Sequence, residues 1–197
     1  METWPLSLII PNFNGEQILP RTLTSVCEAV RVYAGPSEII VVDDASQDNS
    51  IDLILKNFAD IKLVRHDKNR GFSKAVHSGV RAAIYPIIIL LNSDVYPERD
   101  FLAPLVSRFK REDTFSVSPL ILDLDGNPAR VSWNLVRLTR GEIRSSNWDL
   151  TSAVERNQNG QPLKSLFASG GSAAIRKDMF LQLNGFLPIY RPFYYED

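Results

Sequence analysis

A run of five apolar residues that ends in three polar ones is the feature that most constrains how this chain can fold. The run, Ile87–Leu91, is continuous and largely β-branched, with Pro86 before it and Pro97 shortly after it. Such a run predicts a strand buried on both faces, which is typical of parallel sheets covered by helices. The polar residues Asn92–Asp94 therefore fall at the carboxyl end of a buried strand, where open α/β sheets bind ligands.

Asp94 is the charged residue at this strand end. A desolvated carboxylate needs a cation or a hydrogen-bond donor, because taking its charge out of water is costly. Mg²⁺ is usually held by one or two carboxylates together with phosphate oxygens, so Asp94 indicates a metal bridge to a phosphorylated substrate. The alternative is that Asp94 only caps the helix that follows, as many Asp residues after strands do.

Strand and helix patterns alternate along the first part of the chain. Short apolar runs predict the strands, and apolar residues three and four apart predict the helices between them. The expected strands are 6–10, 38–42, 61–65 and 87–91, and the expected helices are 19–32, 51–58, 72–83 and 99–110. This alternation predicts an α/β fold, a mostly parallel open sheet with helices on both faces.

The later part of the chain follows a different pattern. Residues 115–122 predict a further strand, and residues 166–175 predict a strand of small residues that another group approaches closely. Residues 123–161 are polar with little periodicity and favour a solvated loop. Four arginines make this loop locally basic and leave open an anion-facing acceptor loop: Arg130, Arg137, Arg140 and Arg144. A short helix is expected from Lys177 to Leu183.

Composition excludes several classes of protein. The chain has 197 residues, a hydrophobic content of 44% and a net charge of −1, which describes one globular domain with no preference for nucleic acid. Cys27 is the single cysteine, so no internal disulfide forms and a reducing compartment is expected. The amino terminus lacks the basic and apolar regions of a signal peptide, and no apolar run reaches the length of a membrane span. We therefore expect a cytoplasmic protein.

Four segments in order carry a family resemblance: Val41–Ser46, Asn69–Phe72, Asn92–Asp94 and Tyr195–Asp197. Together they resemble the family 2 glycosyltransferases, which are inverting enzymes with a GT-A fold. The resemblance covers nearly the whole chain. It implies a single GT-A domain over residues 1–197, with a nucleotide-sugar-binding half at 1–122 and an acceptor-side half at 123–197. Because relatives continue beyond the last motif, the domain is expected to be truncated at its carboxyl end.

The resemblance assigns the nucleoside to the ends of the first two strands and to the loop after the third, namely Pro11, Asn12, Asp43, Asp44, Asn69, Arg70 and Gly71. A carboxylate accepts a hydrogen bond from the imide N–H of uracil or thymine, so a UDP- or dTDP-sugar is favoured as donor. Gly71 allows the backbone to approach the base closely.

Asn92, Ser93 and Asp94 resemble the DXD motif, whose first position holds ribose and whose last ligates Mg²⁺ or Mn²⁺ on the diphosphate. Asn92 in place of Asp keeps hydrogen bonding but loses charge, which puts metal affinity mainly on Asp94. Glu196 and Asp197 resemble the ED motif, whose Asp serves as the catalytic base.

The resemblance therefore implies transfer of a sugar, with inversion, from a nucleotide-diphosphate sugar to a saccharide or lipid-linked acceptor. Polysaccharide or cell-wall synthesis is the implied process. The region missing after Asp197 is expected to provide any peripheral association with the inner face of the membrane.

Other nucleotide-site proteins fit the motifs less well or stay open. A receiver domain carries its Asp pair after the first strand, whereas here Asp43 and Asp44 follow the second. A dinucleotide-binding dehydrogenase needs a Gly-x-Gly turn after the first strand, and the residues at 11–14 are Pro-Asn-Phe-Asn. A non-catalytic nucleotide-sugar-binding protein and a sugar nucleotidyltransferase remain alternatives.

Overall fold

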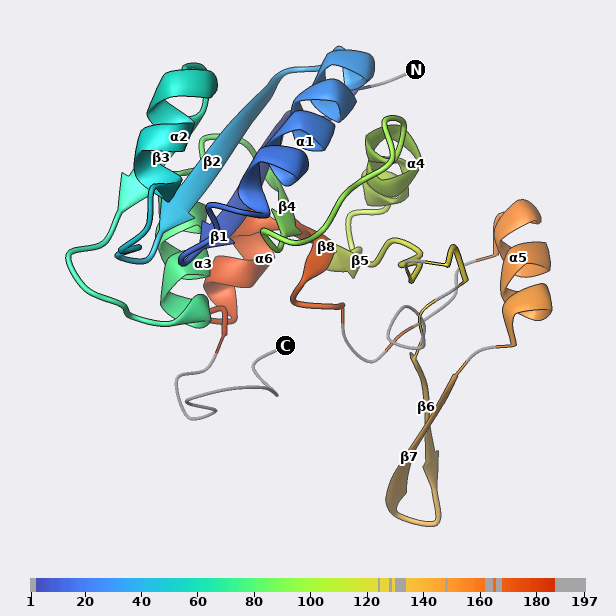
Figure 1. The fold of residues 1–197 in the computed structure, drawn as a ribbon. Coiled ribbons are helices and arrows are strands. Elements are labelled where there is room, and N and C mark those ends of the chain that lie inside the picture. The colour runs from blue at the N-terminus through green and yellow to red at the C-terminus, as the bar shows by residue number, and fades with distance from the viewer. Residues whose placement is uncertain are drawn as a thin grey trace.

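A computed structural model describes residues 3–123, 125–127, 129, 134–147, 149–161, 165 and 168–186 of the chain. Its main feature is a six-stranded sheet with the strand order β3-β2-β1-β4-β8-β5 (Figure 1). The strands are β1 (Leu6–Asn12), β2 (Ser37–Asp43), β3 (Lys62–Arg65), β4 (Ile87–Leu91), β5 (Ser116–Val117) and β8 (Ser172–Arg176). The helices are α1 (Leu19–Tyr33), α2 (Ser50–Asn57), α3 (Phe72–Ala82), α4 (Leu102–Val106), the 3-10 helix η1 (Ser107–Lys110), α5 (Leu150–Gln158) and α6 (Lys177–Gln182).

The sheet is mostly parallel, as the alternating pattern predicted. Strands β3, β2, β1 and β4 run parallel to one another, and β8 runs antiparallel to both β4 and β5. The chain moves outward from β1 through β2 to β3 and then returns to place β4 on the other side of β1. Open α/β sheets bind ligands at such a reversal, outside the carboxyl ends of the strands.

Alternate side chains of the strands build a hydrophobic core on each face of the sheet. Helices α1, α2 and α4 cover one face, which includes Ile10 and Val41. Helices α3 and α6 cover the other, which includes Ile9 and Val42 (Figure 1). Because β4 contributes to both cores, every residue of Ile87–Leu91 is at most 1% exposed. This confirms the predicted strand buried on both faces.

Helix α3 lies so close to the sheet that Gly79 has no room for a side chain. A Cβ atom there would lie 2.4 Å from Cγ2 of Ile9 and 3.1 Å from Cγ2 of Val42. Gly→Ala within a helix favours the helix by about 0.8–1 kcal/mol, whereas overpacking a core costs about 1–3 kcal/mol. We expect Gly79→Ala to lower the free energy of unfolding by about 1–2 kcal/mol in urea titrations. Lys74→Ala, on the exposed side of the same helix, is the control, and equal losses in both variants would contradict this packing.

Three expected elements are shorter than the sequence pattern suggested. The helix predicted over 99–110 begins only at Leu102, because Pro104 lacks an N–H and fits only a first turn. It changes to 3-10 geometry at Ser107. Of the strand predicted over 115–122, the part that joins the main sheet is Ser116–Val117, since Pro119 cannot donate to a ladder. The strand predicted over 166–175 is described from Ser172, after a turn at residues 170–171.

Residues 134–158 correct the prediction of a solvated loop. Strands β6 (Asn134–Thr139) and β7 (Glu142–Asn147) form a separate antiparallel hairpin that projects away from the main sheet, and α5 follows it (Figure 1). The tight turn has positive φ at Arg140 (52°) and Gly141 (82°), as two-residue hairpin turns require. Arg140 is an unusual residue for that position, which is why the turn was missed. The anion-facing acceptor loop stays a hypothesis.

The two predicted halves share one sheet, because β8 from the later part of the chain lies between β4 and β5. Among the described helices, none is both long and apolar enough to cross a membrane.

Candidate functional site

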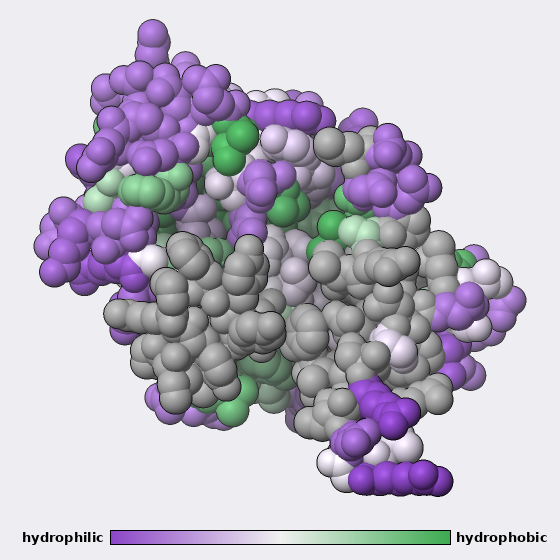
Figure 2. Space-filling view, turned by 60° about the horizontal axis from the view of Figure 1, so that its bottom comes forward, coloured by the Kyte–Doolittle hydropathy of each residue, from purple (hydrophilic) through white to green (hydrophobic). Residues whose placement is uncertain are grey.

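Polar residues gather at the carboxyl edge of the parallel strands, as predicted. Asn12 and Asp43 are register partners at the ends of β1 and β2, and Asn92 follows the last residue of β4. Because β8 is antiparallel, its first residue, Ser172, pairs with Leu91 at the same edge. Figure 2 brings the lower end of the Figure 1 view forward, with hydrophilic residues along the margin and hydrophobic residues between them.

Asp43 ties the loops after β1 and β2 together. Its carboxylate accepts hydrogen bonds from Asn12 Nδ2 (3.0 Å), Ser46 Oγ (2.6 Å) and Ser46 N (3.0 Å). Asn12 Nδ2 also donates to Ser46 Oγ at 3.2 Å, and Asp43 has no exposed surface. Asp43 therefore stabilises the two loops that form the site. Its side chain offers no surface to a ligand. Pro11 is likewise buried, within β1.

Further hydrogen bonds hold the same two loops in one arrangement. Asn14, which has a φ of 53°, accepts from Gln47 N through Oδ1 at 2.8 Å. Asp48 Oδ2 accepts from Glu16 N at 2.9 Å. Burial raises the pKa of Asp48, but hydrogen bonds from Ser50 and the backbone outweigh it and hold the pKa of this carboxyl below its ordinary value. The loops are thus shaped before any ligand binds.

Asp44 lies on the α3 face of the sheet and binds the loop after β3. It accepts from Gly71 N at 2.7 Å and from Arg70 N, which is shared between its two oxygens at 2.9 and 3.1 Å. Nδ1 of His66 is its third partner, at 2.5 Å. Each oxygen therefore has one donor of its own, His66 Nδ1 on Oδ1 and Gly71 N on Oδ2, and both share Arg70 N. Asp44 is 4% exposed, unlike the fully covered Asp43.

The loop Asn69, Arg70 and Gly71 is shaped by a left-handed glycine. Gly71 has a φ of 84°, which favours glycine, whereas a Cβ there would have no atom within 4 Å. Glycine is therefore required by the backbone conformation in which the N–H of residue 71 reaches Asp44. Within the described chain, no atom lies close enough to exclude a side chain there. Asn69 Oδ1 accepts from Gly71 N at 3.1 Å, and the Arg70 side chain pairs with exposed Asp67 at 2.6 Å.

The turn after β4 presents Asp94 to solvent, so the expectation of a desolvated carboxylate is wrong. The buried run ends at Leu91, and Asp94 stands at the turn that follows. Asp94 does not cap the next helix, which begins at Leu102 with Phe101 in the cap position. Ser93 is held by its carbonyl, which accepts from Thr22 Oγ1 of α1 at 2.5 Å.

Three buried polar atoms at this edge lack a hydrogen-bond partner within the described chain: Asn12 Oδ1, Asn92 Oδ1 and Ser172 Oγ. Buried polar groups are nearly always satisfied, so a ligand or water is expected to supply these partners. Two glycines make room for the amides. A Cβ at Gly15 would lie 2.0 Å from Asn12 Oδ1, and one at Gly171 would lie 2.9 Å from Asn92 Nδ2. A fourth such atom, Trp4 Nε1, precedes β1 at the opposite edge.

The described residues offer no cage of three or more metal-binding side chains. Asp94 has no ion pair or hydrogen bond to another described residue, and Asn92 carries an unpaired amide oxygen close to it in sequence. A single carboxylate fits an ion completed by phosphate oxygens and water, the usual way in which Mg²⁺ is bound. Asp94 is thus suited to a metal that arrives with a phosphorylated ligand.

An aromatic cluster packs the end of the described chain against α3. Phe186 lies 6.0 Å from Phe72 and 5.5 Å from Phe180, measured between ring centroids. The ring of His77 lies tilted against Phe180, and its Nε2 lies 3.3 Å from the Phe186 carbonyl oxygen. Burial lowers the pKa of His77. The cluster places Phe186 beside the first turn of α3, which directly follows Gly71. Glu196 and Asp197 lie outside the described residues.

Two groups at the edge were missed by sequence reasoning. Phe13, which lies between Asn12 and Asn14, is 49% exposed. Its position directly after β1 was the sequence signal that could have indicated it. Ser172 gave no signal, because its place depends on pairing between β8 and β4.

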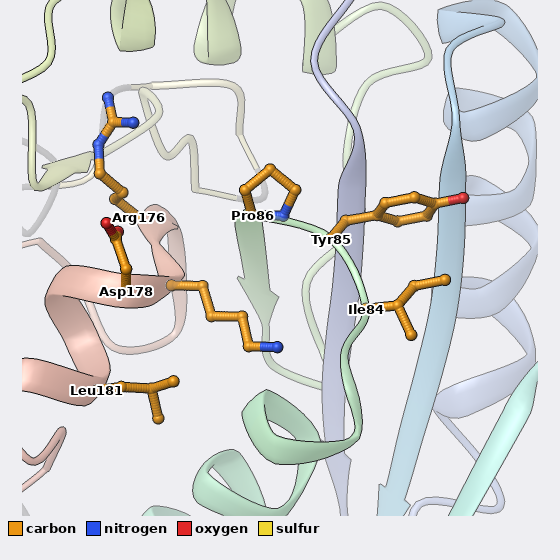
Figure 3. Close-up of a pocket in the computed structure, with 7 residues that line it drawn as sticks. Ile84, Tyr85, Pro86, Arg176, Asp178 and Leu181 are labelled. Carbon is orange, nitrogen blue, oxygen red and sulfur yellow. The ribbon is translucent and has the colours of Figure 1, made fainter.

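Two described cavities lie away from this edge. One, of about 360 Å³, is lined by residues that enter β4 and begin α6, so it opens at the opposite edge of the sheet (Figure 3). Its basic groups are already bonded: Lys177 donates to the Ala83 carbonyl, and Arg176 donates to the carbonyls of Phe109 and Thr114. The other, of about 400 Å³, lies between α1 and α4. Neither competes with the carboxyl edge as a site for chemistry.

A doubly wound sheet with acidic and amide groups at its switch point defines the class of open α/β proteins whose ligands bind at that point. Within that class, the family described as Glycosyl transferase family 2 matches residues 7–183. The chain therefore belongs to glycosyltransferase family 2.

Individual relatives agree with this assignment. Polypeptide N-acetylgalactosaminyltransferase 6 of Bos taurus is 28% identical over 194 residues, which cover 89% of this chain and 30% of the relative. An undecaprenyl-phosphate 4-deoxy-4-formamido-L-arabinose transferase of Pectobacterium carotovorum is 33% identical over 94 residues, covering 46% of this chain and 29% of the relative. The chain thus spans less than a third of the length of these two relatives.

Solved structures confirm the GT-A fold. A mannosyltransferase of Pyrobaculum calidifontis, in complex with GDP-Man and Mn²⁺, matches with a TM-score of 0.67 and 20% identity over 95% of this chain and 48% of its own. S. aureus TarS 1-349, in complex with UDP-GlcNAc, matches with a TM-score of 0.64 and 16% identity over 93% of this chain and 48% of its own.

Proposed function

We propose that this chain is the donor-binding part of an inverting, metal-assisted glycosyltransferase. Its donor is a nucleotide-diphosphate sugar at the carboxyl edge of the sheet, and Asp197 is the general base. The observation that carries the proposal is the convergence, at one switch point, of the exposed carboxylate Asp94 with buried polar atoms that lack a partner among the described residues. Binding of GDP-Man and UDP-GlcNAc by two proteins of the same fold supports a nucleotide-sugar donor.

Asp44 is the carboxylate proposed to read the base. It keeps some exposed surface, whereas Asp43 is covered and holds Asn12 and Ser46. An imide N–H of uracil or thymine would be a further donor to this carboxylate, beside the shared Arg70 N. The exposed ring of Phe13 is proposed as a stacking surface, because aromatic rings stack on bases at little cost in specificity.

Asp94 is proposed to hold Mg²⁺ or Mn²⁺ together with the diphosphate. Mn²⁺ in the mannosyltransferase of the same fold supports a divalent ion. When bound, such an ion supplies Lewis-acid stabilisation of the charge that develops on the departing diphosphate. Asn92 is proposed to meet the ribose through its unpaired oxygen, which accepts from a hydroxyl group. Thr22 keeps the turn that carries both residues in place.

The acceptor is proposed to be a saccharide or a lipid-linked hydroxyl, as in polysaccharide or cell-wall synthesis. Relatives named as an undecaprenyl-phosphate sugar transferase and as a poly-beta-1,6-N-acetyl-D-glucosamine synthase support this choice. We propose a cytoplasmic location at the inner face of the membrane, in keeping with the single cysteine.

The base pocket gives a direct binding prediction. Uracil and guanine carry an imide-type ring N–H, whereas the corresponding nitrogen of adenine only accepts. We expect UDP to bind about 30-fold more tightly than ADP in calorimetry with Mn²⁺, because this ring nitrogen of ADP cannot donate to Asp44. GDP serves as a second imide-bearing ligand. Equal affinities for ADP and UDP would rule out base reading by this carboxylate.

Catalysis separates the proposal from its alternatives. A glycosyltransferase moves the sugar from the nucleotide to an acceptor hydroxyl and releases a nucleoside diphosphate. A non-catalytic binding protein retains the donor unchanged, and a sugar nucleotidyltransferase exchanges the donor with labelled pyrophosphate. Incubating full-length protein with a labelled nucleotide sugar and acceptor saccharides, followed by product separation, distinguishes the three.

A further inference from the structure

A chain of three side chains, two of them buried, runs beneath the proposed base pocket. His66, directly after β3, contacts Asp44 Oδ1 through Nδ1 at 2.5 Å and Ser78 Oγ through Nε2 at 2.9 Å. The His66 and Asp44 side chains are only 6% and 5% exposed. Ser78 lies on α3, so the chain joins β3, the end of β2 and α3. In sequence, His66 is 22 residues from Asp44 and 12 residues from Ser78.

Hydrogen-bond chemistry sets the direction of this chain. An ionised carboxylate only accepts, so Nδ1 of His66 must carry the proton that lies toward Asp44. Nε2 is then free to accept from the Ser78 hydroxyl, which can rotate to donate. Ser78 therefore holds the ring from one side while the ring holds the carboxylate on the other. The tautomer of His66 is assigned by its partners.

Asp44 is oriented by donors from two sides. The backbone N–H groups of Arg70 and Gly71 hold it from the loop side, and His66 holds it from below. The two backbone donors move with their loop, whereas the ring of His66 is attached to the sheet, since His66 N also donates to the Asp43 carbonyl at 2.9 Å. The ring is thus the contact that fixes the carboxylate, and through it the loop, relative to the strands.

We propose that His66 is the positioning residue of the nucleotide pocket. Its Nδ1–H fixes the orientation in which Asp44 presents its exposed edge to the base, and it keeps the Arg70–Gly71 loop closed before the nucleotide arrives. His66 does not touch the nucleotide. This inference rests on the proposed function, in which Asp44 reads the base.

Two substitutions at the same position separate the contacts of the ring. In His66→Asn the side-chain NH₂ falls near the place of Nδ1 and keeps a donor toward Asp44 while losing Ser78. In His66→Gln the NH₂ falls near the place of Nε2 and keeps contact with Ser78 while losing the donor to Asp44. We expect His66→Asn to bind UDP within about threefold of the parent. His66→Gln should bind UDP about 10- to 100-fold more weakly, because it loses a hydrogen bond to a charged group.

The controls are Ser78→Ala and the ligand ADP. Ser78→Ala keeps Nδ1–H and should change UDP affinity by less than His66→Gln does. ADP, whose ring N1 carries no hydrogen to donate to Asp44, should bind all variants alike. Thermal unfolding of each variant shows whether any change in affinity follows from loss of the fold. Equal losses of UDP affinity in His66→Asn and His66→Gln would overturn the proposal and leave His66 a core residue only.

Amide hydrogen exchange of Arg70 and Gly71 tests the clamp without a nucleotide. Their N–H groups should exchange slowly in the parent and in His66→Asn, and at least about tenfold faster in His66→Gln, because a freed carboxylate no longer holds the loop. Unchanged exchange in His66→Gln would overturn the clamp even if nucleotides bind. If Arg70 and Gly71 exchange slowly in a parent chain that binds no nucleotide, the hold of Asp44 on the loop is supported and the proposed function is contradicted instead.

Discussion

Replacing Asp94 by Asn is expected to lower the Mn²⁺-dependent affinity for UDP by at least about 100-fold. Removing a residue that merely supports a metal ligand already costs about 10- to 100-fold in metal affinity, and removing a ligand itself should cost no less. Asp94 is exposed, has no ion pair to another described residue and belongs to no described cluster of three metal-binding side chains, so no such cluster replaces its charge. Asn keeps the size and removes the charge, which isolates the role of the metal.

Calorimetry with Mn²⁺ and again with EDTA measures this effect. The parent should lose affinity on addition of EDTA, and Asp94→Asn should bind weakly under both conditions. Asp100→Asn is the matched control, since Asp100 is an exposed carboxylate a few residues further along the same segment. An Asp94→Asn variant with parental affinity in both conditions would exclude Asp94 as the metal ligand.

The sheet and its polar carboxyl edge could be predicted from sequence because their signals are local. Ile87–Leu91 is apolar throughout since both of its faces are buried, and its observed bounds match the prediction. Each parallel strand changes to polar residues where it leaves the core, which marked Asn12, Asp43 and Asn92 as neighbours before their contacts were known. The order of the strands then brings these ends to one edge.

The different roles of Asp43 and Asp44 could not be predicted, because they depend on contacts between segments that are distant in sequence. Asp43 and Asp44 are adjacent in sequence but lie on opposite faces of the sheet, as alternation along β2 requires. One is closed off by Ser46, whereas the other meets His66 and the loop at Gly71. The sequence alone does not distinguish Asp43 from Asp44. Their hydrogen-bond partners in the structure do.

The exposure of Asp94 and the hairpin at residues 134–147 were missed for a related reason. The burial of a strand does not extend into the turn that follows it, so a carboxylate three residues past Leu91 is already in solvent. The hairpin has no place in the main sheet, and its strands therefore lack the continuous apolar pattern of β4.

Replacing Asp197 by Asn is expected to slow sugar transfer by about 100- to 10,000-fold, the range that a positioned proton-transfer group contributes. Inversion needs the acceptor hydroxyl in line with the departing diphosphate, and the proton of that hydroxyl must leave as the new bond forms. Donor affinity should be unchanged, because the base contacts the acceptor and not the nucleotide. The assay is transfer of labelled sugar by full-length protein at saturating donor, alongside calorimetry with UDP.

The reach of the chain is compatible with this role. Phe186, packed against Phe72 at the start of α3, is eleven residues before Asp197. Eleven residues extend at most about 36–40 Å, so the tether does not keep Asp197 from the carboxyl edge. Asp178→Asn, an exposed carboxylate on α6, is the control for a general effect of lost charge. If Asp197→Asn transfers sugar at the parent rate, another group removes the proton. A loss of donor affinity equal to the loss of rate would instead place Asp197 in the donor site.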